Sequence, residues 1–303
     1  MPLYQFDSQC SQFSVNQIKP TSFLSEKQLQ ILFEANLEIL LGVRFVASEF
    51  FTSDRQKGRI DTLGLDQDGS PTIIEYKKSS KENVINQGLF YMDWLVDHKG
   101  DFAIAAQQAL GNDVNIDWSQ PRLILIAESF SEYDKYAVNR IGANIELWTY
   151  HKYGQDFLYL EPIFISRPLK KIATEETPVE KAQPYYTTEF HLKGKAESIY
   201  SLFIALQERI FSLAEEGEII EKPVKTYIAY KRGKNFCEVE IQANSIKIWL
   251  DIPYKDLNDP YNLGRDVSDI GHYGTGDVEV RLSSLDNIDK VMDLIEQSYK
   301  LTT

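Results

Sequence analysis

Two carboxylic acids and a lysine in the first third of the chain have the types and the spacing of a hydrolytic metal site. Asp61 lies in one predicted strand, and Glu75 and Lys77 end the next. Side chains two residues apart on a strand point to the same face, so Glu75 and Lys77 project together. If the two strands pair antiparallel through the turn at 66–70, Asp61 reaches the same edge. The segment therefore predicts two carboxylates that converge beside an ammonium group.

Such a group of side chains has a definite use in phosphodiester hydrolysis. Carboxylate oxygens suit Mg²⁺ or Mn²⁺, and such a cation neutralises phosphate charge and lowers the pKa of an attacking water. A lysine ammonium can hold that water or stabilise the transition state. The alternation of Glu75 and Lys77 is also typical of the solvated face of an ordinary strand, and this second interpretation stays open on spacing alone.

Three neighbouring features favour the catalytic interpretation. The two residues before Glu75 are isoleucines, which places the charged pair at the end of a core strand. Gln87 and Tyr91 lie four residues apart, and therefore on one face of the helix that follows. A helix before the first strand offers a further carboxylate, either Glu26 or Glu34.

The elements that must position these residues follow from the hydrophobic periodicity. A helix begins at a Ser25 cap and ends at Gly42. The remaining elements predicted in the first half are strands at 43–51, 59–65, 72–77, 121–127, 144–150 and 157–165 and helices at 82–97, 101–110 and 132–141. The order of a helix, a three-strand meander, a helix and a strand predicts an α/β sandwich rather than a doubly wound sheet.

In this order the residues resemble the PD-(D/E)XK nuclease superfamily, whose members share the restriction-endonuclease-like fold. The resemblance covers about residues 20–165. Gln87 and Tyr91 resemble the extra motif of RecB-type exonucleases, and residues 58–77 resemble the mismatch or branched-DNA endonucleases of the NucS type. Ile60 stands where the family motif has proline. The resemblance implies an α-βββ-α-β core, followed here by a smaller α+β domain.

The same resemblance implies a role for each candidate residue on the two strands. Asp61 and Glu75 would hold the metal, joined by the backbone carbonyl of Tyr76. Lys77 would be the catalytic lysine that positions the water. The metal-binding set is thus an aspartate and a glutamate on adjacent strands.

The helices on either side complete the implied catalytic set. Gln87 and Tyr91 would support the substrate or the active site. Glu26 would supply the helix carboxylate, with Glu34 as the alternative. The resemblance therefore predicts that both helices reach the edge of the sheet where the acids lie.

The chain divides around a segment rich in proline and charge. Residues 167–190 show no apolar periodicity and are predicted to link a nuclease-like domain at 1–166 to an accessory domain at 191–303. In the accessory domain, cations and aromatic residues such as Tyr230 and Phe236 mix across a predicted hairpin. Such mixing either stacks single-stranded bases or belongs to an ordinary half-buried sheet.

The net charge of the chain opposes nucleic-acid binding globally but not near the candidate site. The 303 residues carry a formal charge of −13, which predicts weak non-specific binding to nucleic acid. The sequence around the two acids is locally basic and could contact phosphate groups, although a solvated loop has the same composition. This predicted basic rim consists of Arg55, Lys57, Arg59, Lys78 and Lys81.

Other features exclude whole classes of protein. No apolar run approaches the roughly 20 residues of a membrane span, and the N-terminus has neither the basic nor the apolar region of a secretion signal. Two distant cysteines, Cys10 and Cys237, exclude a disulfide framework. A cytoplasmic protein is therefore expected.

We therefore expect a Mg²⁺- or Mn²⁺-dependent nuclease that hydrolyses phosphodiester bonds, with DNA as the expected nucleic acid. The alternative is a catalytically inactive protein of the nuclease fold that binds nucleic acid or protein. A homodimer is a further expectation, because nucleases of this class often pair to cut two strands. The accessory domain is a candidate surface for a protein partner.

Overall fold

The computed structural model of the chain describes residues 2–7, 14–52, 58–78, 84–141, 143–165, 186–215, 217–272 and 274–302. The chain divides into two units, Met1–Leu40 with Arg44–Thr174, and Leu41–Val43 with Glu175–Thr303. Most of the predicted linker at 167–190 lies outside the described residues.

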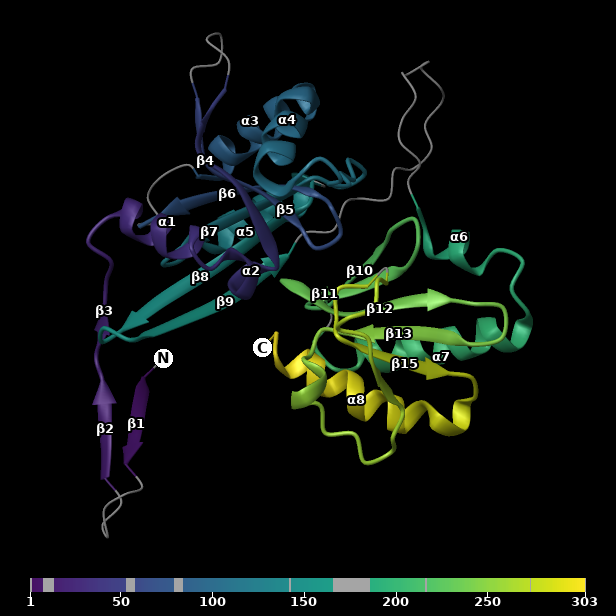
Figure 1. Cartoon of the computed structure of the whole chain (residues 1–303). Helices are drawn as coiled ribbons and strands as arrows, with labels where there is room; N and C mark the ends of the chain where they lie inside the picture. Colours follow the sequence, from purple (N-terminus) through teal and green to yellow (C-terminus); the bar gives the residue numbers. More distant parts are fainter. Residues whose placement is uncertain are drawn as a thin grey trace. The chain divides into compact units, whose positions relative to one another are not determined.

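The N-terminal half combines helices with a seven-stranded mixed sheet and a separate two-stranded sheet formed by its first two strands (Figure 1). Its elements are β1 (Leu3–Asp7), β2 (Ser14–Ile18), β3 (Pro20–Thr21), α1 (Glu26–Glu34), α2 (Leu37–Leu41), β4 (Val43–Phe51), β5 (Arg59–Asp66), β6 (Pro71–Lys77), α3 (Val84–Asp97), α4 (Lys99–Leu110), β7 (Arg122–Ala127), α5 (Glu132–Ile141), β8 (Ile145–Tyr153) and β9 (Phe157–Ile165). The seven-stranded sheet has the order β3-β8-β7-β6-β5-β4, and β9 also pairs with β8. The predicted succession of helix, three strands, helix and strand is confirmed.

The first helix begins as predicted but is shorter. The hydroxyl of Ser25 caps α1 by accepting a hydrogen bond from the N–H of Gln28 at 3.1 Å. The single predicted helix is wrong, because α1 ends at Glu34 and α2 begins at Leu37. Between them, the side chain of Asn36 donates to the carbonyl of Leu32 at 2.8 Å. This bond satisfies a C-terminal carbonyl of α1 and favours its termination.

Strands β5 and β6 form the predicted antiparallel hairpin. Their register pairs Thr62 with Ile74. One oxygen of the Asp66 carboxylate accepts hydrogen bonds from the N–H groups of Asp68 at 3.0 Å and Ser70 at 2.7 Å. Gly69 completes the turn with a φ of 81°, a conformation that glycine adopts readily. The turn fixes the register that brings the two candidate acids to one edge.

Strand β6 is central and covered on both faces. It pairs in parallel with β7, and β7 pairs in parallel with β8. Helices α3, α4 and α5 contribute to the core that includes Ile73. On the other face, the ring of Phe33 in α1 lies 5.6 Å from the ring of Tyr76. Apolar layers on both sides therefore hold the strand that ends in Glu75 and Lys77.

The second unit is an α+β domain, as expected. Its elements are α6 (Thr188–Leu192), α7 (Glu197–Phe211), β10 (Ile220–Pro223), β11 (Ile228–Arg232), β12 (Lys234–Ile241), β13 (Ile246–Leu250), η1 (Tyr254–Asp256), β14 (Gly264–Asp266), β15 (Val278–Leu282), η2 (Leu285–Asn287) and α8 (Ile288–Lys300). The sheet has the order β10-β11-β12-β13-β15-β14, with antiparallel pairing throughout. Residues of α7 and α8 share one core with the sheet.

The sequence also predicts a strand at 225–231 in the second half, and the structure differs there. This strand begins at Ile228, and β10 precedes it. The N–H of Val224 donates to the carbonyl of Tyr227 at 2.9 Å. This bond closes a tight turn, so residues 224–227 connect two strands rather than extend one.

Candidate active site

Backbone N–H groups of the paired strands β5 and β6 bind the carboxyl groups of Asp61 and Glu75. The N–H of Asp61 donates to Oε1 of Glu75 at 3.0 Å, and the N–H of Tyr76 donates to Oδ2 of Asp61 at 3.1 Å. The hairpin register therefore positions both carboxyl groups.

The electrostatic environment of this pair favours a bound proton. Glu75 is fully buried, and its Oε2 has no hydrogen-bond partner among the described residues. Burial, followed by the charge of Asp61, raises the pKa of Glu75 to about 9. Burial also raises the pKa of Asp61, against the opposing hydrogen bond from the N–H of Tyr76. At neutral pH the pair therefore holds a proton in the absence of another cation.

Lys77 lies beside a carboxylate from the preceding helix. Its ammonium nitrogen is 3.6 Å from Oε2 of Glu26, and the lysine side chain is 12% exposed. The other oxygen of Glu26 accepts a hydrogen bond from the N–H of Lys78 at 3.1 Å. Glu26, at the first residue of α1, therefore reaches the end of β6.

Glu34 takes a different position from Glu26. Its Oε1 accepts hydrogen bonds from the hydroxyl of Thr62 at 2.7 Å and the side-chain amide of Gln30 at 2.8 Å. Thr62 follows Asp61 on the strand and so points to the opposite face of the sheet. The contacts of Glu26 and Glu34 thus place Glu26 at the lysine and Glu34 among uncharged partners.

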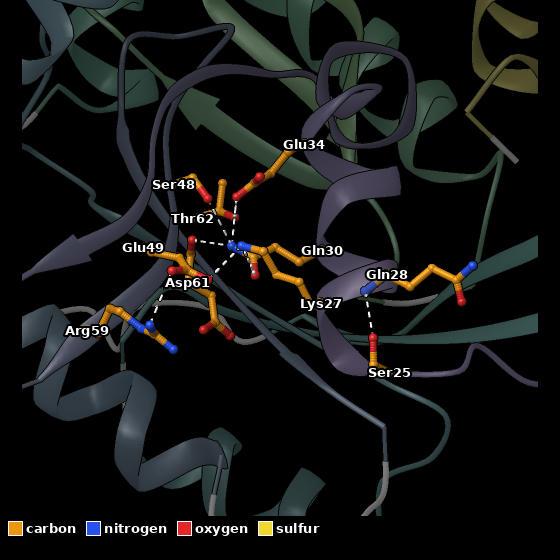
Figure 2. Close-up of polar contacts among 10 residues, drawn as sticks. All are labelled: Ser25, Lys27, Gln28, Gln30, Glu34, Ser48, Glu49, Arg59, Asp61 and Thr62. Carbon is orange, nitrogen blue, oxygen red and sulfur yellow. Dashed lines mark hydrogen bonds and ion pairs between the residues drawn. The ribbon is translucent and has the colours of Figure 1, made fainter.

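Gln30 joins the helix to the strand of Asp61, and sequence reasoning missed it. Its side-chain nitrogen donates to the carbonyl oxygen of Asp61 at 2.7 Å and to the hydroxyl of Ser48 at 3.2 Å (Figure 2). The residue is 5% exposed. Glu26, Gln30 and Glu34 are spaced by four along α1, and this polar stripe is the signal that could have identified Gln30.

Gln87 and Tyr91 support the other side of the same strand. The hydroxyl of Tyr91 accepts hydrogen bonds from the N–H of Arg59 at 3.2 Å and the side chain of Gln87 at 3.3 Å. A β-carbon on Gly58 would lie 2.6 Å from a ring carbon of Tyr91, so only glycine fits this close approach. Tyr91 therefore contacts the backbone just before Asp61, and Gln87 supports the hydroxyl of Tyr91.

The predicted basic rim is described only in part. The guanidinium of Arg59 pairs with Glu49 at 3.1 Å, and the ammonium of Lys78 donates to the carbonyl of Leu24 at 3.5 Å. The other three members, Arg55, Lys57 and Lys81, lie outside the described residues. A cation absent from the prediction, Lys27, lies 2.6 Å from Glu49.

The base-stacking interpretation of the accessory hairpin is wrong for its central rings. Tyr230 and Phe236 are both fully buried and belong to the core shared with α7 and α8. Tyr230 also donates its hydroxyl hydrogen to Glu221 at 2.7 Å. These rings pack the domain because their strand alternation directs them toward the helices.

The donor set for a cation is small. Among the described residues, no group of three or more His, Cys, Asp and Glu side chains is arranged to hold a metal ion. Asp61 and Glu75 form a pair of hard oxygen donors, and the buried Oε2 of Glu75 lacks a hydrogen bond. A divalent cation that replaced the shared proton would satisfy this oxygen, so the pair fits Mg²⁺ or Mn²⁺.

No helix among the described residues combines the length with the apolar character of a membrane span.

The fold and this site define an α/β protein with a carboxylate pair on two adjacent strands, one acid buried and one half-buried, followed in the chain by an α+β unit. An uncharacterized protein of Haemophilus influenzae is 33% identical to this chain over 296 residues, which cover 94% of the chain and 96% of that protein. The chain belongs to the same family as that protein. A family model described as a domain of unknown function, DUF5655, matches residues 188–302.

Solved structures show only weak similarity to the chain. EndoMS in complex with double-stranded DNA is 16% identical, with a TM-score of 0.30, over 48% of this chain and 64% of that chain. A repair endonuclease from Pyrococcus abyssi is 19% identical, with a TM-score of 0.25, over 41% of this chain and 47% of that chain. The chain thus spans less than two thirds of either protein. At this level of similarity, the strand order and contacts of the chain itself define its fold.

Proposed function

We propose that the protein is a Mg²⁺- or Mn²⁺-dependent nuclease that hydrolyses phosphodiester bonds, with DNA as the substrate. The observation that carries the proposal is the pair formed by the buried Glu75 and the half-buried Asp61, which backbone hydrogen bonds between β5 and β6 hold together. The charge of Lys77 acts on both acids. Burying two adjacent acids is unfavourable unless a cation or a proton neutralises them. A divalent cation bound between the two acids would neutralise them and would be placed for hydrolysis.

The residues of the chain divide the work of hydrolysis. When bound, the metal supplies charge neutralisation and lowers the pKa of a water. Asp61 and Glu75 hold it, and the ammonium of Lys77 orients the attacking water and stabilises negative charge on the phosphoryl oxygens. Glu26, whose Oε2 lies 3.6 Å from the ammonium nitrogen, holds Lys77 in position at the end of β6.

Two further residues keep Asp61 in place. Gln30 binds its carbonyl oxygen, and Tyr91 binds the N–H of Arg59, two residues earlier. The strand is therefore held from both adjoining helices. Such support matters because a small displacement of a catalytic group costs a large part of the rate.

Metal titration followed by a substrate panel tests the proposal. Calorimetry should detect Mg²⁺ or Mn²⁺ binding to the wild type and none to the double variant Asp61→Asn/Glu75→Gln. The wild type should then cleave at least one of a set of labelled linear, nicked, mismatched or flapped DNA substrates when the metal is present. Binding without cleavage of any DNA, or cleavage of RNA alone, would contradict the proposed reaction.

The charge of the chain favours one alternative from another class. A formal charge of −13 suits a protein that docks a basic protein partner. Such a scaffold would keep the fold but would show no metal binding at Asp61 and Glu75. The calorimetric titration therefore separates the two functions before any substrate is chosen.

A further inference from the structure

Three charged side chains from three different elements meet beside the candidate active site (Figure 2). The ammonium nitrogen of Lys27 in α1 lies 2.6 Å from Oε1 of Glu49 in β4. The guanidinium of Arg59 in β5 lies 3.1 Å from Oε2 of the same glutamate. Each oxygen of one carboxylate thus binds one cation, so the two cations flank the same carboxylate.

Both cations are connected to Asp61, one along its own strand and the other through a hydrogen-bonded side chain. Arg59 precedes Asp61 by two residues on the same strand and therefore points to the same face. Burial raises the pKa of Asp61, and the charge of Arg59 is among the interactions that oppose this shift. The ammonium of Lys27 also lies 3.3 Å from the side-chain oxygen of Gln30, which binds the carbonyl of Asp61. Arg59 therefore lies near Asp61, and Lys27 is connected to Asp61 through Gln30.

The backbone of Glu49 is unusual for a strand residue. Its φ is 50°, in the left-handed region that non-glycine residues rarely adopt. Such a conformation is unfavourable for glutamate, and strained residues of this kind cluster at functional sites. In this conformation the carboxylate of Glu49 lies between Lys27 and Arg59.

The three side chains are accessible to a solute. Lys27 is 49% exposed, Arg59 53% and Glu49 34%. Exposed ion pairs contribute little to stability, so a competing anion can displace the carboxylate at low cost. A phosphodiester carries one negative charge over two non-bridging oxygens, as a carboxylate does, and it accepts the same charge-assisted hydrogen bonds.

We infer that Lys27 and Arg59 form a phosphate-binding site for the nucleic-acid strand, and that Glu49 occupies this site in the free protein as a competitor within the chain. The inference rests on the proposed function, because it takes the ligand to be a nucleic-acid phosphate. It gives α1 a second role, because this helix positions Lys27 for the nucleic-acid phosphate and Glu26 beside Lys77. Substrate binding exchanges Glu49 for phosphate.

Equilibrium binding of a short labelled DNA duplex to the full chain, in EDTA so that no cleavage occurs, tests this site. Glu49→Gln and Glu49→Gly both remove the competing carboxylate, and the glycine variant also relieves the backbone. Both should tighten binding about three- to tenfold at low salt. The plot of log affinity against log salt should steepen by up to about 0.9 for each additional phosphate neutralised.

Two further variants separate the site from a general charge effect. Lys27→Gln/Arg59→Gln should weaken binding, and adding Glu49→Gln to it should change nothing further. Glu296→Gln removes the same charge from an ion pair with Lys300 at 2.8 Å in the second unit and should leave affinity unchanged. Thermal unfolding confirms that each variant is folded.

The outcomes distinguish this inference from the proposed function. If the wild type binds the duplex but neither Glu49 variant tightens binding, or if Glu296→Gln tightens it equally, the phosphate site is overturned and the nuclease proposal stands. If no variant binds DNA and the wild type cleaves none, both are overturned.

Discussion

The N–H of Asp61 donates to a carboxylate oxygen of Glu75 at 3.0 Å, so the backbone of one strand holds the acid of the next. The reverse contact, from the N–H of Tyr76 to Asp61, is 3.1 Å long. Because these bonds belong to the hairpin, the acids are positioned before any ligand arrives. Their closeness in a buried place is also why one of them retains a proton.

The first prediction concerns the pH dependence of stability. The pKa of Glu75 is about 9 in the folded protein and 4.5 when unperturbed. Between these values the folded state holds a proton that the unfolded state has released, so stability falls as pH rises. We expect the wild type to lose on the order of a few kcal/mol relative to Glu75→Gln between about pH 5 and pH 9. Urea unfolding in EDTA measures this difference, and a constant difference across that range would contradict it.

A second prediction follows for metal binding. A cation that binds Asp61 and Glu75 must displace the shared proton, so binding near neutral pH should release about one proton. Calorimetry in two buffers with different ionisation enthalpies measures this number. Apparent affinity should also increase with pH up to about 9. Binding without proton release would place the metal elsewhere on the chain.

Glu26 and Glu34 provide a matched pair of variants. Glu26→Gln removes the carboxylate next to Lys77, and the cleavage rate should fall about ten- to a hundredfold. Glu34→Gln weakens the bonds to Gln30 and Thr62, and the free energy of unfolding should fall by about 1 kcal/mol with the cleavage rate retained. Rates and urea unfolding for both variants test the assignment. The reverse result would make Glu34 the helix carboxylate.

A buried ion pair supports the sheet away from these acids. The guanidinium of Arg122 in β7 donates to Glu146 in β8, with one bond at 2.8 Å, and both residues are almost fully buried. Arg122→Met leaves the charge of Glu146 unpaired, and the free energy of unfolding should fall by about 3–5 kcal/mol. Urea unfolding measures this loss, and a change below about 1 kcal/mol would contradict it.

The matched control for this prediction removes both charges. Arg122→Met/Glu146→Leu should recover part of the stability, because no buried charge remains. In the wild type the indole N–H of Trp148 donates to Glu146 at 2.9 Å. Recovery should be incomplete, because the double variant removes this acceptor. A double variant less stable than Arg122→Met would contradict the prediction that the unpaired charge of Glu146 destabilises the single variant.

The sequence predicts the central part of the fold because burial there leaves a strong pattern. Strand β6 has two isoleucines directly before the charged Glu75, and the turn at Asp66 and Gly69 has a specific backbone chemistry. The pairing of β5 with β6, and with it the meeting of Asp61 and Glu75, follows from that turn. Local features of this kind are visible in one sequence.

Other features depend on contacts between distant parts of the sequence. The polar stripe of α1 can identify Gln30, but it does not identify the partner of Gln30, the carbonyl of Asp61. The ion pairs of Glu49 join it to cations from two other elements. Strand β2 is almost entirely exposed, so it lacks the alternation that predicts strands. These contacts and this strand are visible only in the folded structure.

The most direct test of the proposed function is cleavage of labelled DNA by the wild type and by Lys77→Ala in the same metal. The variant keeps Asp61 and Glu75, so calorimetry should show that it still binds Mg²⁺ or Mn²⁺. Its cleavage rate should fall at least about a hundredfold, because no ammonium orients the water or stabilises the transition state. Equal cleavage by the two proteins, or none by the wild type on every DNA substrate, would contradict the assignment of this site as a nuclease centre.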